Sequence, residues 1–120
     1  MRTVNTKTQA KNIAKEASDH KAKDIVVMDL RHVASFADYF VICSGGSERH
    51  VQAIADAVAF DQKKRGKKLL GEEGRSNARW ILLDYGDVIM HIFYDEERRH
   101  YNLENLWHDA KRVMFKGITS

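Results

Sequence analysis

The sequence predicts an α/β fold in which helices flank a mixed β-sheet. Apolar residues recur at helical spacing near the N-terminus and again after Ser47, which is typical of amphipathic helices. Two runs rich in Ile and Val lie between them, over Asp24–Leu30 and Asp38–Ser44, and these are typical of buried strands. Two further apolar runs flank Gly86-Asp87, a pair that favours a β-hairpin turn. Helices and strands mixed in this way indicate a layered α/β domain.

The expected order of elements along the chain is α-β-β-α-β-β-β-α. The first helix covers residues 8–22, because Ile13, Ala14 and Ala17 share one side of it. The two strands rich in Ile and Val follow it, and residues 31–37 form an irregular crossing between them.

A second helix is expected to begin after Ser47, a residue type that often caps helix N-termini. Apolar residues recur at helical spacing from Val51 to Val58. Gly66 suits the position just beyond the C-terminus of this helix, because glycine adopts the left-handed conformation found there.

A short strand over Lys67–Leu70 and a polar loop over Gly71–Asn77 lead into the predicted hairpin. Its strands cover Arg79–Tyr85 and Asp87–Tyr94, and a two-residue loop with Gly first suits a type II′ turn. This turn sets the register of the two strands. The predicted cross-strand pairs are Tyr85 with Val88, Asp84 with Ile89, Leu83 with Met90, Leu82 with His91, Ile81 with Ile92 and Trp80 with Phe93.

The predicted register divides the hairpin into two unlike faces. The face that contains Leu83 and Met90 is almost wholly apolar and must be buried. The other face carries an acid, an imidazole and two large aromatic side chains. Such a mixed face is either the border of the core, with its polar groups hydrogen-bonded inside the protein, or a surface that binds a partner.

Length and composition indicate a single domain over residues 1–120, with a core over about residues 8–113 and a short tail over 114–120. A last helix is expected over Leu103–Val113. The hydrophobic fraction of 43% is ordinary for a globular fold. Cys43 is the sole cysteine, which excludes an intramolecular disulfide and a cysteine-based zinc cluster, and its apolar surroundings favour a buried thiol.

No run of residues is long and apolar enough to span a membrane, and the N-terminal residues lack the apolar stretch of a secretory signal. These features predict a cytoplasmic protein. The net charge of +3 is unevenly distributed. Basic residues gather over Lys63–Lys68, where a solvated helix end and a secondary contact with RNA are both open interpretations. Acidic residues gather in the C-terminal third, which favours a basic protein as the partner there.

Two kinds of chemical site deserve consideration. Gly45-Gly46-Ser47 lies at a strand-to-helix turn and resembles a phosphate-binding loop, yet no strand carries the paired carboxylates that hold magnesium in a nucleotidyltransferase. Asp84 and His91 lie diagonally on one face of the hairpin, where a hydrogen-bonded pair is the simpler expectation than a metal or acid–base site. We therefore expect no catalytic residue, no cofactor and no metal.

Residues 80–107 resemble the signature of the Iojap family, the ribosomal silencing factors. Upstream elements of the family are also present, from Asp38-Tyr39-Phe40 through Ser44-Gly45-Gly46-Ser47 to the helix that begins near Arg49. The resemblance covers roughly residues 8–113. The signature residues of this chain are Trp80, Asp84, Gly86, Asp87, His91, Phe93, Arg98, Tyr101, Leu103, Glu104, Leu106 and Trp107.

The resemblance implies a nucleotidyltransferase-like (Iojap) fold without enzymatic activity. It implies binding to the large ribosomal subunit through ribosomal protein uL14, which blocks subunit joining and represses translation, and a homodimer when the protein is free. The alternative is a nucleotide-binding or nucleotidyltransferase-type enzyme. The residues that the resemblance assigns to partner binding are Trp80, Leu82, Asp84, Tyr85, Asp87, His91, Tyr101 and Glu104.

Overall fold

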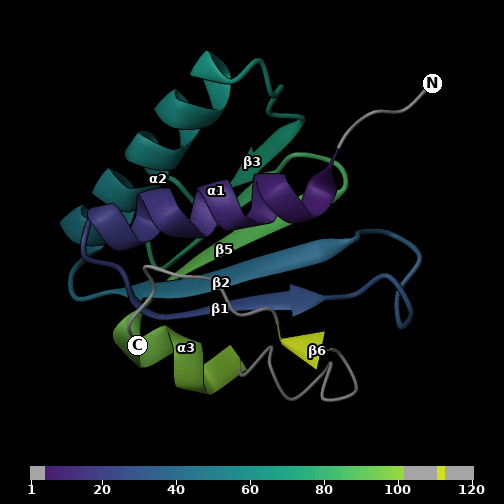
Figure 1. Ribbon diagram of the computed structural model, residues 1–120. Coiled ribbons are helices and arrows are strands. Elements are labelled where there is room, and N and C mark those ends of the chain that lie inside the picture. Colours follow the sequence, from purple (N-terminus) through teal and green to yellow (C-terminus); the bar gives the residue numbers. More distant parts are fainter. Residues whose placement is uncertain (1–4, 102–110, 113–120) are drawn as a thin grey trace.

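A six-stranded mixed sheet with the strand order β3-β4-β5-β2-β1-β6 forms the centre of the molecule (Figure 1). The computed structural model describes the backbone of residues 5–101 and 111–112 and the side chains of residues 5–98. Its elements are α1 (Thr6–Asp19), β1 (Lys23–Asp29), β2 (Tyr39–Gly45), α2 (Glu48–Lys64), β3 (Gly71–Glu73), β4 (Trp80–Asp84), β5 (Val88–Tyr94), α3 (Asp95–Tyr101) and β6 (Lys111–Arg112).

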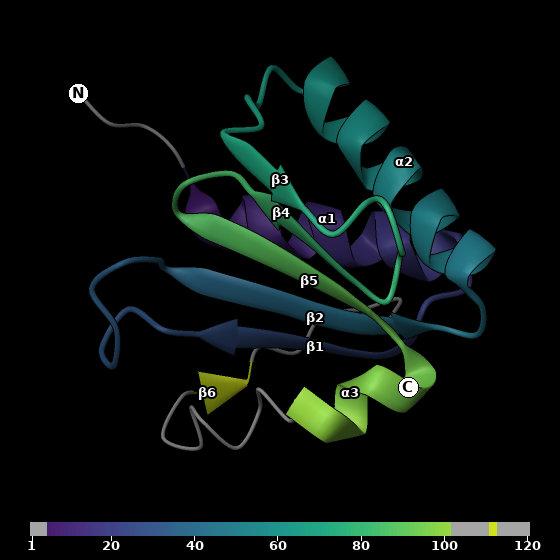
Figure 2. The same cartoon turned by 180° about the vertical axis from the view of Figure 1, so that it is seen from behind.

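The two central strands, β2 and β5, are parallel, and each of the other neighbouring pairs in the sheet is antiparallel. Helices α1 and α2 pack side by side on one face of the sheet, and α3 lies on the opposite face (Figures 1 and 2). This arrangement confirms the predicted α/β class with a mixed sheet and flanking helices.

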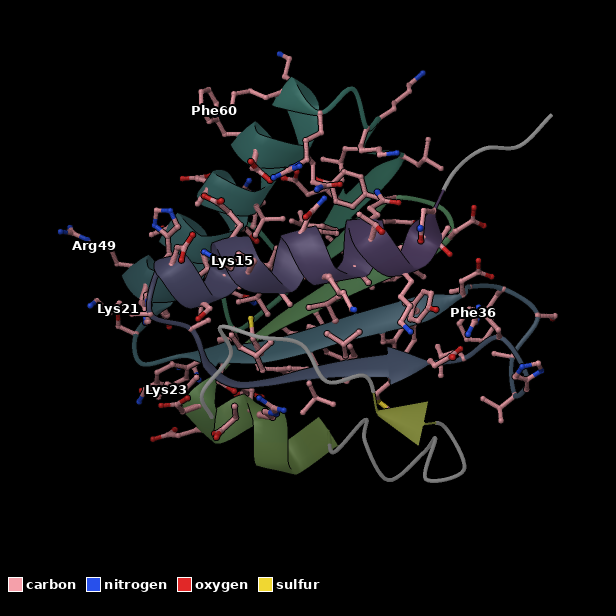
Figure 3. The ribbon with its side chains drawn as sticks, viewed as in Figure 1. Lys15, Lys21, Lys23, Phe36, Arg49 and Phe60 are labelled. Carbon is pink, nitrogen blue, oxygen red and sulfur yellow. The ribbon has the colours of Figure 1, made fainter. Side chains whose placement is uncertain are left out.

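Both long helices begin at the capping residues that their sequences contain. The side chain of Asn5 accepts a hydrogen bond from the amide of Thr8 at the start of α1. The hydroxyl of Ser47 accepts from the amide of His50 at 3.0 Å, as the sequence predicts. The outer sides of both helices are charged and exposed, with Lys15 of α1 and Arg49 of α2 among the side chains that reach solvent (Figure 3).

The β4–β5 hairpin has the predicted register, from Trp80 opposite Phe93 to Asp84 opposite Ile89. Gly86 has a φ of 91°, and Asp87 lies outside the positive-φ region, which is the pattern of a type II′ turn. The amide of Tyr85 donates to the carbonyl of Val88 at 3.0 Å and closes the ladder next to the turn.

Two predicted elements differ from the structure. The third strand is Gly71–Glu73, not Lys67–Leu70, because pairing with β4 begins only where Gly71 lies opposite Asp84. A short helix, α3, follows β5 directly. The predicted helix over Leu103–Val113 lies mostly outside the described residues, and its described part, Lys111–Arg112, is instead a strand paired with β1.

The sheet buries an apolar cluster on each face. The larger cluster lies between the sheet and helices α1 and α2, and it includes Cys43, whose thiol is buried as predicted. The smaller cluster lies on the opposite face around Met28, Phe40 and Phe93, and the partly buried Trp80 packs against it. The alternation of side chains along each strand assigns neighbouring residues to different clusters.

Replacing Gly74 by Ala is expected to destabilise the fold more than replacing Gly66 by Ala. Both glycines have a positive φ, so either alanine costs about 1 kcal/mol in backbone strain. A Cβ at Gly74 would also overlap the carbonyl oxygen of Trp80, whereas a Cβ at Gly66 meets nothing within 4 Å. Chemical denaturation should show a loss of about 3 kcal/mol for Gly74→Ala and about 1 kcal/mol for Gly66→Ala. Equal losses would contradict this packing of the β3–β4 connection.

Candidate recognition surface

The mixed face of the hairpin lies on the side of the sheet that α1 and α2 leave uncovered. We call this surface the hairpin face, and its members alternate with core residues along β4 and β5. Trp80, Leu82, Asp84 and Ile89 are partly exposed, while His91 and Phe93 are buried beneath them. The hairpin face consists of Trp80, Leu82, Asp84, Ile89, His91 and Phe93.

The indole of Trp80 is held in place from two directions. Its ring stacks on Phe93 with 4.9 Å between centroids and 27° between planes. Its Nε1–H donates to Nδ1 of His91 at 3.1 Å. The imidazole of His91 in turn meets the ring of Phe40 edge-on at 4.5 Å. Trp80 is therefore a rigid, partly exposed aromatic side chain, which is the kind of group that anchors protein interfaces.

His91 supports this arrangement as a neutral group. Because Nδ1 accepts the indole N–H, the ring proton resides on Nε2. Nε2 is buried and has no hydrogen-bond partner among the residues that the structure describes. Burial lowers the pKa of His91 from 6.5 to about 4, so the ring is uncharged at neutral pH.

The predicted hydrogen-bonded pair of Asp84 and His91 is absent from the described part of the hairpin. The carboxylate of Asp84 accepts from the amide of Gly86 at 2.8 Å, and His91 takes Trp80 as its partner. His91 is diagonal to both residues, and the twist of the strands makes the two diagonals unequal. Asp84 thus stabilises the turn, and His91 holds the indole of Trp80 in place.

Acidic side chains lie at the turn and along the β3 edge of the hairpin face. Asp84 is partly exposed, and Asp87 is exposed at the tip of the hairpin. Glu73 is exposed on β3 and lies opposite Leu82 in the ladder. These carboxylates give the edge of the surface a negative character.

Sequence reasoning missed two members of this neighbourhood, Glu73 and Phe36. Ile89 lies opposite Asp84 on the hairpin face, as the predicted register has it. Glu73 was missed because β3 was expected four residues earlier. Phe36 is 54% exposed in the β1–β2 connection, where its ring lies 6.1 Å from that of Phe40, and no periodic pattern marks it.

The other residues assigned to partner binding have different positions. Tyr85 points to the opposite face, is only 9% exposed and belongs to the larger core cluster, which corrects its assignment to the surface. Burial raises the pKa of its hydroxyl to about 12. The side chain of Tyr101 and the whole of Glu104 lie outside the described residues.

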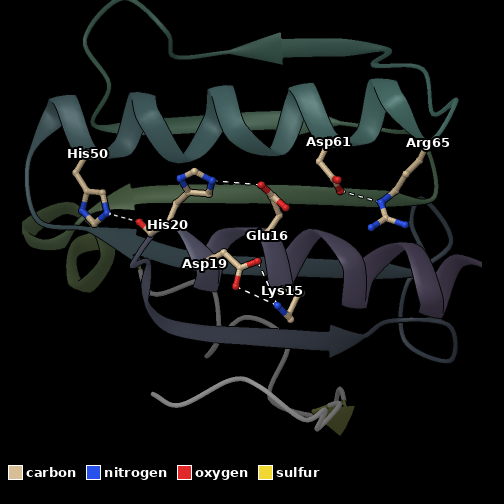
Figure 4. A network of polar contacts seen from close by, with 7 residues as sticks. All are labelled: Lys15, Glu16, Asp19, His20, His50, Asp61 and Arg65. Carbon is tan, nitrogen blue, oxygen red and sulfur yellow. Dashed lines mark hydrogen bonds and ion pairs between the residues drawn. The ribbon is translucent and has the colours of Figure 1, made fainter.

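The loop at Gly45-Gly46-Ser47 uses its polar groups internally. The amide of Gly46 donates to Nδ1 of His50 at 3.0 Å, and the hydroxyl of Ser47 accepts from the amide of His50. Nε2 of His50 then reaches the carbonyl oxygen of His20 at 2.9 Å, which ties the start of α2 to the end of α1 (Figure 4). The loop is thus organised for helix capping, and these groups do not point toward an open phosphate site.

Within the described residues, no group of three or more His, Cys, Asp or Glu side chains is placed to hold a metal ion. In the same residues, we find no helix with the length and apolar character needed to cross a membrane.

The buried neutral imidazole predicts a pH-dependent stability. Between pH 6.5 and pH 4 the unfolded state binds a proton at His91 that the native state does not, so the free energy of unfolding falls as the pH falls. The contribution of His91 is fully present above pH 6.5, and about 3 kcal/mol of stability is lost by pH 4. Urea denaturation of the wild type and His91→Phe at both pH values measures this loss, because the Phe variant lacks the group. Parallel losses in the two proteins would contradict a buried neutral His91.

The family model described as "Ribosomal silencing factor during starvation" matches residues 3–120. The chain is 42% identical over 102 residues to Ribosomal silencing factor RsfS of Halalkalibacterium halodurans, which covers 85% of this chain and 87% of that protein. It is 35% identical over 104 residues to Protein Iojap, chloroplastic, of Zea mays, which covers 87% of this chain and 45% of that protein. A crystal structure of a Chromobacterium violaceum protein matches with a TM-score of 0.85 at 29% identity, covering 94% and 93% of the two chains.

These similarities confirm the resemblance seen in the signature residues, and the crystal structure supports the fold. The family model spans nearly all of the chain, and identity to a member remains high over most of its length. This chain therefore belongs to the ribosomal silencing factor, or Iojap, family.

Proposed function

We propose that this protein binds the large ribosomal subunit through ribosomal protein uL14 and thereby blocks joining of the small subunit. Family membership supports a role in silencing the ribosome. The observation that supports the binding site is the hairpin face, where a fixed indole stands among partly exposed apolar and acidic side chains. Translation is repressed because the bound protein occupies the surface that the small subunit needs.

The composition of the hairpin face suits a basic protein as its partner. Trp80, Leu82 and Ile89 supply an apolar centre, and the carboxylates of Asp84 and Asp87 supply a negative rim. Proteins that bind ribosomal RNA are generally basic, so this rim is complementary to them. A buried aromatic anchor with a charged rim is the usual anatomy of a strong interface.

The members of the surface have different proposed roles. Trp80, Leu82, Asp84 and Asp87 are exposed enough to contact the partner, and Tyr101 and Glu104 remain contact residues on the strength of the family signature. His91 is only 4% exposed, so we assign it to positioning the indole. Because the indole N–H of Trp80 already donates to His91, Trp80 contacts the partner through the apolar surface of its ring.

The proposed mechanism is steric occlusion, in which no covalent bond is made or broken. The internal hydrogen bonds of the Gly45–Ser47 loop argue against the nucleotidyltransferase alternative, because that enzyme would need these groups for phosphate. We also propose that the free protein forms a homodimer and acts in the cytoplasm, where the ribosomes of a bacterial cell work. The exposed Phe36 and the partly exposed Trp80 are consistent with a self-associating surface.

Co-sedimentation with isolated ribosomal subunits tests the proposed site. The wild type is expected to pellet with the large subunit and not with the small one. A Trp80→Ala, Asp84→Asn double variant should bind at least about 30-fold more weakly, since it loses the aromatic anchor and one rim charge. The amide side chain introduced at position 84 keeps an oxygen that accepts from Gly86, so the turn is preserved.

The matched control is Asp19→Asn, which removes an exposed negative charge from α1, on the opposite face of the sheet. Thermal melts should show that both variants are folded. Full binding by the double variant would place the interface elsewhere. Binding of the wild type to neither subunit, with a rise in melting temperature on adding ATP and magnesium, would favour the nucleotide-enzyme alternative.

A further inference from the structure

The C-terminal end of α2 carries a group of lysines that the hairpin face does not explain. Lys63, Lys64 and Lys68 are exposed, and Lys67 is partly exposed. Together with Phe60 they form a surface that we call the α2 basic tip. Figure 3 shows Phe60 at this end of α2, directed away from the sheet, and its side chain is 65% exposed.

The lysines of the α2 basic tip keep their charge available. Within the described residues they form no ion pair, whereas Lys15 and Lys23 are paired with Asp19 and Asp95. Arg65 is a neighbour in sequence, but its guanidinium is bound to Asp61 at 2.8 Å. The local positive charge therefore comes from the four lysines.

A helix dipole explains only part of this pattern. Lysines in the last turn of a helix are stabilised by its negative end, which is sufficient for Lys63 and Lys64. Lys67 and Lys68 lie beyond Gly66, outside the last turn of the helix where this stabilisation is strongest. The ammonium of Lys64 also lies 5.1 Å from the centre of the exposed Phe60 ring. Lysines interleaved with an exposed aromatic ring are typical of nucleic-acid contacts.

The α2 basic tip is joined to the hairpin face through the backbone. The amide of Leu70 donates to the carbonyl oxygen of Asp84 at 2.7 Å, so the segment after Lys68 runs directly beside the hairpin. Leu70 also approaches the turn, where its Cδ1 lies close to Gly86. The segment that follows the α2 basic tip thus lies against the turn of the hairpin, which brings the positive surface close to the negative rim.

We propose that the α2 basic tip binds phosphate groups of ribosomal RNA beside the protein that the hairpin face recognises. The inference rests on the proposed function, because it takes the large subunit as the common partner. Ammonium groups that neutralise phosphates release condensed counterions, so this contact contributes affinity that falls steeply with salt. The hairpin face, with its apolar centre, contributes affinity that depends less on salt.

The test uses the full-length chain and two variants with the same change in charge. The first is Lys63→Gln, Lys64→Gln, Lys68→Gln, which neutralises the α2 basic tip. The control is Lys15→Gln, Lys21→Gln, Arg49→Gln, which removes three exposed cations from α1, the segment after it and the start of α2. Figure 3 shows Lys21 and Arg49 at the opposite end of the helix pair from Phe60. Binding is measured to purified large subunits over a range of salt concentrations and, separately, to isolated ribosomal protein uL14.

The tip variant is expected to bind large subunits at least about tenfold more weakly at about 0.1 M salt, with a salt slope shallower by about 2 to 3. It should bind the isolated ribosomal protein as tightly as the wild type does, and the control variant should resemble the wild type on both partners. Unchanged binding of the tip variant to subunits, or an equal loss in the control, would overturn the RNA contact while leaving the proposed function intact.

A loss of the tip variant's binding to the isolated ribosomal protein would show that the lysines contact protein, which also overturns the inference. Failure of the wild type to bind either partner would instead refute the proposed function on which the inference rests.

Discussion

The register of the β4–β5 hairpin is the constraint on which the candidate site depends. Because strand residues alternate between faces, the turn at Gly86 determines that Leu83 and Ile92 enter the core while Trp80 and His91 face the other way. A slip of one residue would bury the acid and imidazole under α1 and α2. The apolar core therefore enforces the register, and the register creates the recognition surface.

Local rules predicted this part of the structure well. The type II′ turn and the alternation of side chains together determine the register, and both are read from neighbouring residues. The position of β3 was harder to predict, because it depends on how far β4 extends rather than on its own three residues. The short strand Lys111–Arg112 is stabilised by distant pairing with β1, which no local pattern reveals.

The polar contacts of the site were less predictable than its backbone. His91 is diagonal to Asp84 and to Trp80, and the sequence offers no reason to prefer the indole. His91 bonds to Trp80 because of contacts made elsewhere in the fold. The amide of Gly86 donates to Asp84, and stacking on Phe93 holds Trp80 within hydrogen-bond distance of His91. Burial of His91 in this position lowers the pKa of its imidazole, so the ring is neutral and its Nδ1 is free to accept from the indole.

The two proposed surfaces carry opposite charges and lie close together on the molecule. The hairpin face is apolar with carboxylates at its rim, and the α2 basic tip is positive, yet the bond between Leu70 and Asp84 connects the segments that carry them. A partner that binds both the hairpin face and the α2 basic tip must present a basic protein and an anionic polymer close to each other. A basic protein embedded in RNA has this character, and few soluble proteins do. Charge arrangement thus adds a physical reason, independent of family membership, for proposing a ribosomal partner.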